Sequence, residues 1–246
     1  NKMDLIPKAE RDQVLAVAAR NLDLEPSEVI GMVATEGDNV GRVVLAIAKS
    51  DPELVQAIAE ALPEYRARLA WQRIGAAAGS AGAVGWIPLP FADLVPLLFI
   101  QSGLVLSIAR IYGYEITLGR AKELIATFGI GFIARTVYQQ VSKLLGVPGW
   151  VLSAAIAAAT TVAIGYGAMM WFAYGEKPTR ESLQKMTTDI ALHLRDQLLG
   201  LGEKRPDRGT LRQRISQALK GLPDQFPAKR RRTTDEGEDH SMEDRA

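Results

Sequence analysis

A single acidic side chain stands inside the most apolar part of this chain. Asp93 is the only charged residue between positions 74 and 109. A carboxylate at bilayer depth is costly, so such residues commonly serve ion or proton transfer. A carboxylate that precedes a helix can instead accept hydrogen bonds from the free backbone N–H groups of the first turn. We expect Asp93 to cap a helix that begins near Leu94, and we keep an ion or proton path as the alternative.

Few other residues have the types and spacing that metal sites or covalent catalysis need. The chain has no cysteine, and its two histidines, His193 and His240, lie far apart in the sequence. This excludes disulfide frameworks, cysteine nucleophiles, and zinc or iron sites with their usual ligands. The sequence has no P-loop and no Gly-x-Ser-x-Gly motif, and no strand pattern precedes the Gly129-x-Gly131 pair. We therefore expect no enzyme activity, no cofactor and no bound metal.

Charge is distributed unevenly along the 246 residues. Positions 1–73 hold 21 charged residues, positions 74–175 hold only 8, and positions 176–246 hold 28. The net charge of +1 excludes a general nucleic-acid-binding protein, which would need a strongly basic surface. The hydrophobic spacing is helical throughout and shows no strand-length alternation. The sequence thus predicts an all-α helical membrane protein with four segments: a soluble helical module (1–70), a membrane-embedded domain (71–175), amphipathic helices (176–222) and a disordered charged tail (223–246).

Two apolar segments in the middle indicate membrane helices. The first, 74–109, begins with many small residues, including a Gly75-xxx-Gly79 spacing that lets helices approach closely in lipid. Three prolines between positions 88 and 96 forbid one regular helix, so this segment is a broken span or a re-entrant hairpin. The second, about 148–174, is uncharged and has tryptophans near both ends. It is the stronger spanning candidate.

The remaining helices are predicted to be amphipathic. One helix over 115–143 should lie on the membrane interface or on the adjoining spans, or else form the core helix of a soluble domain. In the N-terminal module, a serine cap at Ser27 predicts a helix through Val33, and Pro52 predicts another from position 54. After position 176, apolar stripes predict two further helices, with these apolar residues: Leu183, Met186, Ile190, Leu194 and Leu198 in the first, and Leu211, Ile215 and Leu219 in the second.

The middle segment also resembles a known family. The residues that carry the resemblance are the run from Gly85 to Leu97, with Pro88, Pro90, Phe91 and Asp93, then Gln101, the Arg110 region, and the Pro148-Gly149 pair. Over about residues 70–175 they resemble the YcjF-like family, a bacterial domain of unknown function that often follows small-GTPase domains. The resemblance implies a multi-helix membrane-associated module that works with a GTPase, and it brings no catalytic residues. Because this chain has no GTPase motif, we expect either that the GTPase precedes Asn1 in a longer product or that this copy acts alone through its helical flanks.

These observations lead to one leading functional hypothesis and two alternatives. We expect a non-enzymatic integral membrane module, in a bacterial inner or internal membrane, that binds the lipid bilayer and a GTPase or a second copy of itself. A channel, transporter or membrane-remodelling component that uses Asp93 is the first alternative, and a soluble helical protein with a buried apolar hairpin is the second. The flanks near the two apolar segments hold more lysines and arginines than the 110–143 connection between these segments. This excess favours cytoplasmic termini. A re-entrant first segment would instead place the termini on opposite sides.

Overall fold

The computed structural model describes the chain except for residues 52, 85–93, 129, 142–146, 202–205 and 223–246. In the described part the regular structure is helical, with one isolated β-bridge between Val33 and Asp38. The all-α prediction is therefore confirmed. The α-helices are α1 (Arg11–Asn21), α2 (Val40–Ser50), α3 (Leu54–Ala61), α4 (Arg66–Val84), α5 (Leu94–Ile111), α6 (Leu118–Thr127), α7 (Ile130–Val141), α8 (Gly149–Tyr174), α9 (Arg180–Leu199) and α10 (Arg208–Ala218). Short 3-10 helices lie at Met3–Leu5, Lys8–Glu10, Pro26–Glu28 and Pro63–Tyr65.

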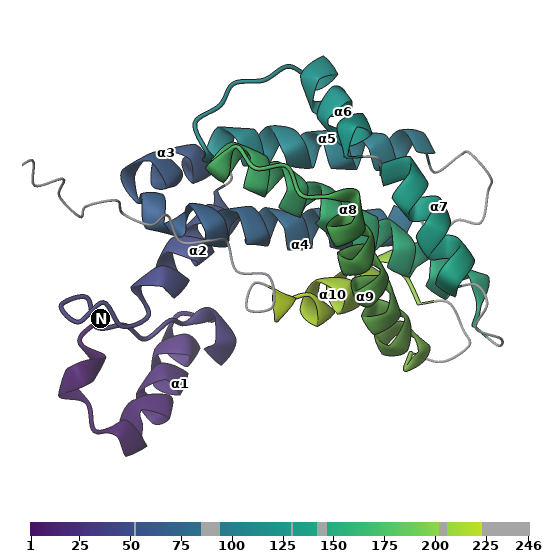
Figure 1. Cartoon of the computed structure of the whole chain (residues 1–246). Coiled ribbons are helices and arrows are strands. Elements are labelled where there is room, and N and C mark those ends of the chain that lie inside the picture. The colour runs from purple at the N-terminus through teal and green to yellow at the C-terminus, as the bar shows by residue number, and fades with distance from the viewer. Residues whose placement is uncertain (52, 85–93, 129, 142–146, 202–205, 223–246) are drawn as a thin grey trace, which may run out of the picture.

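Helix α8 forms the centre of the bundle (Figure 1). It carries no charged residue, so all of its faces are apolar, which is typical of a helix that is buried on every side. Helices α4, α5, α7 and α9 pack around it. Pro148 directly precedes its first residue, and Gly175 ends it with a φ of 69°, a left-handed conformation that glycine adopts without steric cost.

Among the described helices, α8 is the one that is long and apolar enough to cross a membrane. The most apolar window of this helix is 89% buried by the protein's own side chains. The core helix of a soluble protein can have the same length and composition. The length and apolar composition of α8 therefore suit a protein core as well as a lipid bilayer. The predicted second span therefore exists as a helix, and the first apolar segment contributes the shorter apolar helix α5.

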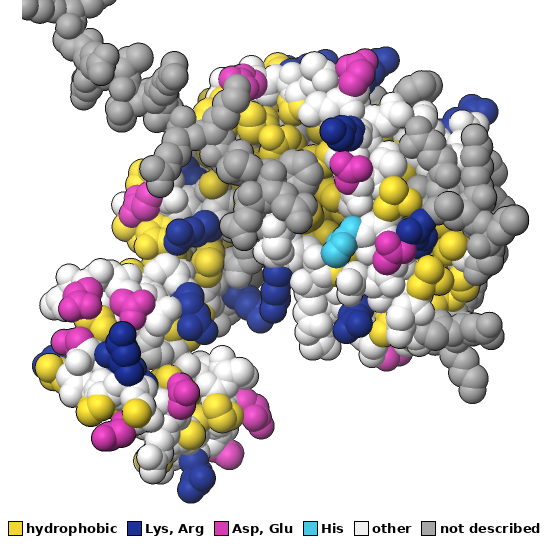
Figure 2. Space-filling model, turned by 60° about the horizontal axis from the view of Figure 1, so that its bottom comes forward, with side chains coloured by type: hydrophobic (Ala, Val, Ile, Leu, Met, Phe, Trp, Pro, Cys, Tyr) yellow, Lys and Arg dark blue, Asp and Glu magenta, His cyan; other side chains and the backbone are white. Residues whose placement is uncertain are grey.

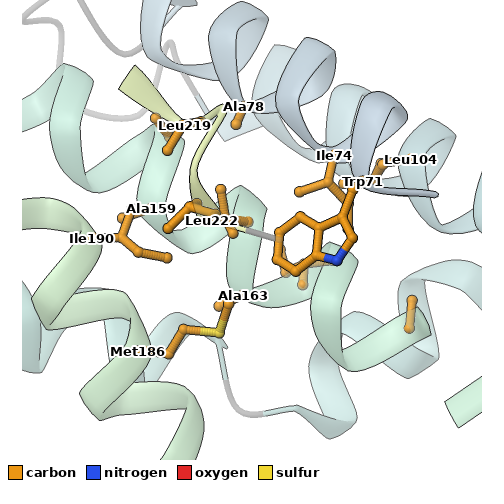
Figure 3. Close-up of a cluster of buried hydrophobic side chains, with 14 of the residues drawn as sticks. Trp71, Ile74, Ala78, Leu104, Ala159, Ala163, Met186, Ile190, Leu219 and Leu222 are labelled. Atoms are coloured by element: carbon orange, nitrogen blue, oxygen red, sulfur yellow. The ribbon is translucent and has the colours of Figure 1, made fainter. Parts of the chain in front are cut away.

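The two C-terminal helices cover the apolar middle of the chain. Every residue of both predicted apolar stripes is buried, which confirms them. Helix α9 packs on α8, and Figure 3 shows Met186 and Ile190 of α9 close to Ala159 and Ala163 of α8. Helix α10 packs on α4. The segment after position 176 is thus part of the same hydrophobic core as the uncharged segment before it.

The small residues of α4 pack against α10. A Cβ atom at Gly79 would lie 2.5 Å from Ser216 Oγ and 2.9 Å from the Arg212 carbonyl oxygen, so only glycine fits at this crossing. The sequence predicted that Gly75-xxx-Gly79 would allow close approach to another helix in lipid. The close approach is real, but in the structure the partner is an amphipathic helix rich in arginine.

Two other predicted helices differ from the structure. The segment after Ser27 forms only one 3-10 turn, with a capping box between Glu25 and Glu28, and the chain is extended at Val29. Several β-branched residues lie between positions 29 and 33, and such residues lower helix propensity.

The amphipathic helix predicted over 115–143 is two helices, α6 and α7. Helix α6 packs on α5, whereas α7 packs on α8 and α9, so the chain has to change direction between them. Phe128, the residue that ends α6, is buried, and its ring lies 3.3 Å from where a Cβ on Gly167 of α8 would stand.

Helix α1 and the turns around it form a small unit that projects from the main bundle (Figure 1). Its buried residues are few, chiefly Met3, Ala19 and Val33. Helices α2 and α3 connect this unit to α4, the first long helix of the bundle. The disordered tail predicted over 223–246 lies outside the described residues.

Candidate functional site

The predicted motif centres on the connection between α4 and α5, which pack against each other. Four of its residues, Pro88, Pro90, Phe91 and Asp93, lie outside the described residues. The two interpretations of Asp93, a helix cap or an ion path, therefore both stay predictions. The described candidates are Gln101 and Arg110 on α5, and Pro148 and Gly149 at the start of α8.

Gln101 is a buried contact between α5 and α8. Its side chain is only 6% exposed, and its Nε2 donates a hydrogen bond to Thr161 Oγ1 at 3.4 Å. The Thr161 hydroxyl in turn donates to the carbonyl oxygen of Ala157 at 2.7 Å. A buried amide needs such partners, because an unpaired polar group in a core costs stability. Gln101 therefore contributes a buried polar contact to the packing of α5 on α8.

Arg110 lies at the other end of α5 and points to the surface. Its side chain is exposed in the last helical turn, where a positive charge interacts favourably with the helix dipole. It lines a hollow of about 430 Å³ that is also lined by Glu53 and Gln56. About 13 Å of helix separates Arg110 from Gln101, at 1.5 Å per residue. The structure therefore does not bring Gln101 and Arg110 together into one site.

The first turns of α5 leave large apolar side chains exposed. Val95 is 60% exposed and Phe99 is 61% exposed. Residues four apart lie on one face of a helix, so these two side chains form a single patch, which we call the α5 entry face. The ammonium group of Lys122 on α6 lies 6.0 Å from the centre of the Phe99 ring, within the range of a cation–π contact. The α5 entry face directly follows the apolar segment 85–93.

Sequence reasoning missed which residues of this segment face outward. It recognised positions 94–109 as apolar, but a helix whose residues are almost all apolar has no periodicity that distinguishes its faces. Val105 and Ile108 of the same helix are fully buried. A usable signal existed in Ser102 and Gln101, since polar residues in such a helix commonly face other helices.

The far end of α5 is held by aromatic packing. The rings of Tyr114 and Phe172 have their centres 5.2 Å apart, and the rings of Trp71 and Tyr166 have theirs 6.1 Å apart. Burial raises the pKa of Tyr112 well above its ordinary value, and the neighbouring Tyr174 adds to this effect. The Tyr114–Phe172 contact joins the turn after α5 to the end of α8, and the Trp71–Tyr166 contact joins α4 to α8. Val95 and Phe99 lie at the opposite, N-terminal end of α5.

Comparison with known families identifies the domain. A family model described as "Domain of unknown function (DUF697)" matches residues 50–196, more than half of the chain. The chain belongs to the DUF697 family. The matched region runs from α3 through most of α9, so it includes the central helix α8 and the α5 entry face. The predicted relationship to a domain of unknown function is confirmed.

The other comparisons give no match. No curated protein and no solved structure is significantly similar to this DUF697 chain.

Proposed function

We propose that this DUF697 chain is a non-enzymatic helical module that associates with a membrane through the α5 entry face and the apolar segment before it. The observation that carries the proposal is the exposure of Val95 and Phe99 beside a segment that is itself apolar in sequence. Contiguous apolar surface on a folded protein is typical of a protein or membrane contact. Full burial of side chains of this size stabilises an association by about 1.5–3 kcal/mol each.

The packing of α9 favours insertion of the α5 entry face into the membrane over a crossing of the membrane by α8. Helix α9 lies along α8, and its outer face carries exposed charged residues such as Lys185 and Asp189. A charge at the bilayer centre costs roughly 2.5–3.5 kcal/mol on the insertion scale. In this arrangement a crossing by α8 would bring those charges into the hydrocarbon region. A shallow or re-entrant contact at the α4–α5 connection avoids that cost. An integral crossing remains the alternative, and it requires α9 to separate from α8.

The partner proposed for the module is a GTPase or a second copy of the chain. The support for a GTPase is the resemblance of the motif around Pro88 and Asp93 to the YcjF-like family. The charged outer face of α9 and the projecting α1 unit offer polar surfaces for such a contact. A bacterial inner membrane, with cytoplasmic termini, is the location that the sequence favours.

Vesicle flotation tests the membrane proposal. Purified full-length chain is mixed with vesicles of phosphatidylglycerol and phosphatidylcholine and centrifuged on a density gradient. The parent should float with the vesicles, and the double variant Val95→Ser/Phe99→Ser should stay largely in the soluble fraction. The control Val14→Ser/Val17→Ser changes two exposed apolar residues of α1 and should float like the parent. Equal flotation of both variants would contradict the role of the α5 entry face.

Extraction of cell membranes with alkaline carbonate distinguishes the two modes of association. Release of the chain supports a shallow contact, and retention in the pellet supports an integral crossing.

A further inference from the structure

A second candidate site lies away from the α5 entry face, beside the N-terminal half of α4. It is a cavity of about 610 Å³ between α2, α4 and the end of α10. Most of its lining is apolar, and the buried residues at its floor are Trp71, Ile74, Val162, Leu219 and Leu222. Figure 3 shows the side chain of Leu222 lying next to the Trp71 indole. The volume is in the range of about 300–1,000 Å³ typical of small-molecule sites.

Four basic side chains surround this apolar floor. Lys49, Arg68, Arg212 and Lys220 line the cavity, and all four are exposed, so they lie at its mouth. Among the described residues, the lining includes no aspartate or glutamate, although the chain as a whole carries a net charge of only +1. None of the four forms an ion pair with another residue in the part of the chain that the structure describes. Figure 2 shows lysine and arginine side chains gathered on the part of the bundle next to the projecting N-terminal unit.

Hydrogen bonds hold the walls of the cavity in place. Gln72 of α4 donates through Nε2 to the carbonyl oxygen of Leu45 in α2 at 3.1 Å. Ser216 of α10 donates through Oγ to the carbonyl oxygen of Gly75 in α4 at 3.4 Å. These polar groups of the lining thus have partners within the protein. At the mouth, the Arg68 guanidinium lies 5.5 Å from the centre of the Tyr65 ring, within the range of a cation–π contact. Among the described residues, Lys49, Arg212 and Lys220 are the charged groups of the lining that are left to bind a ligand.

We propose that this cavity binds a single-chain anionic amphiphile. Its alkyl chain would lie against Trp71, Leu219 and Leu222, and its carboxylate or phosphate head would lie among the four basic side chains. Charge complementarity selects the anionic head, because four cations line one mouth and have no carboxylate partner among the described residues. The apolar floor selects an alkyl chain over a free anion, since burial of apolar surface is favourable. This site is independent of the proposed membrane contact.

Isothermal titration calorimetry of the purified full chain tests the ligand class. The ligands are dodecyl phosphate and dodecanoate below their micelle concentrations, dodecyltrimethylammonium with the same chain and a cationic head, and inorganic phosphate with no chain. We expect one dodecyl phosphate or dodecanoate per chain, and binding at least about tenfold weaker for the other two ligands, because each lacks one of the two interactions. Equal affinity for the cationic amphiphile, or for inorganic phosphate, would overturn the proposal. Binding to phosphatidylglycerol vesicles without binding of either monomeric anion would also overturn it.

Substitutions at the mouth test the role of the cations. Arg212→Gln/Lys220→Gln should weaken binding of dodecyl phosphate by about tenfold or more, since bonds to charged groups are the stronger hydrogen bonds. The control Lys185→Gln/Arg214→Gln removes the same charge from exposed positions outside the cavity. It should change the affinity for dodecyl phosphate by less than about twofold, because solvent and salt screen charges that do not contact the ligand. Equal effects of the two pairs would contradict a specific site.

A cavity-filling substitution tests the floor without removing any contact. A Cβ atom at Gly75 would meet no heavy atom within 4 Å, so Gly75→Leu can extend into open space along the lining. The folded variant should lose dodecyl phosphate binding. Unchanged binding by a variant with native circular dichroism would contradict the assignment.

The Val95→Ser/Phe99→Ser variant should bind dodecyl phosphate like the parent. Failure of the membrane proposal can therefore be distinguished from failure of the cavity proposal.

Discussion

Ser216 of α10 donates a hydrogen bond to the carbonyl oxygen of Gly75 in α4, with 3.4 Å between the two oxygen atoms. The contact joins positions 141 residues apart in the sequence. It places the C-terminal helix directly on the small-residue face of α4. The C-terminal flank, which reads as a separate soluble segment in the sequence, therefore contributes to the core and to the wall of the basic cavity.

The two glycines of the Gly75-xxx-Gly79 pair should respond oppositely to alanine. Gly75→Ala adds a methyl group in open space within a helix and should raise the free energy of unfolding by about 0.5–1 kcal/mol. Gly79→Ala places its methyl group against Ser216 and the Arg212 backbone, and it should lower that free energy by about 1–3 kcal/mol. Urea denaturation followed by circular dichroism measures both. A gain in stability for Gly79→Ala would show that α10 does not lie on α4 as described.

The buried polar residues between α5 and α8 give a second pair of predictions. Ser102 Oγ is buried and has no hydrogen-bond partner within the described structure, so Ser102→Ala should raise the free energy of unfolding by up to about 1 kcal/mol. Thr161→Val removes the hydroxyl that accepts the hydrogen bond from the Gln101 amide, and it should lower the free energy of unfolding by about 1–3 kcal/mol. Thermal or urea unfolding of the two variants under identical conditions checks the expected difference in sign. Similar losses in both would contradict the packing of α5 on α8.

Burial of Tyr112 predicts a loss of stability at alkaline pH. Its pKa is raised in the folded chain, whereas in the unfolded chain it has the ordinary value of about 10. Below that value both states are protonated and the contribution of the buried phenol is fully present. As pH rises above it, the unfolded state loses its proton while the folded state keeps it, so the free energy of unfolding falls. Between pH 8 and pH 11, the urea midpoint should fall less steeply with increasing pH for Tyr112→Phe than for the parent chain. Tyr138→Phe, at an exposed position, should retain the parent slope.

The sequence predicted those helices whose apolar residues repeat on one face. The stripe from Leu183 to Leu198 identified α9 and its buried face, because charged residues separate the apolar positions. The fixed φ of Pro148 and the left-handed Gly175 mark the two ends of α8. The apolar residues between Val29 and Val33 misled the prediction, since β-branched side chains also suit extended backbone.

The environment of α8 could not be predicted from its own residues. An uncharged helix is equally suited to lipid and to the centre of a bundle, and only the packing of α4, α5, α7 and α9 around it shows what covers it here. The α5 entry face was hidden for the same reason, because neighbouring apolar residues give no directional pattern. The basic cavity depends on α2, α4 and α10 meeting, and its lining residues are too far apart in the sequence to form a motif.

The absence of cysteine allows a direct measurement of the membrane contact. A single cysteine is introduced as Phe99→Cys on the α5 entry face, or as Lys185→Cys on the outer face of α9, and labelled with an environment-sensitive NBD fluorophore. On addition of phosphatidylglycerol vesicles, the account predicts a blue shift and increased emission from position 99 and no change from position 185. An unchanged spectrum at position 99 would contradict the central claim. A blue shift at both positions would instead show that α9 also enters the lipid, as an integral crossing requires.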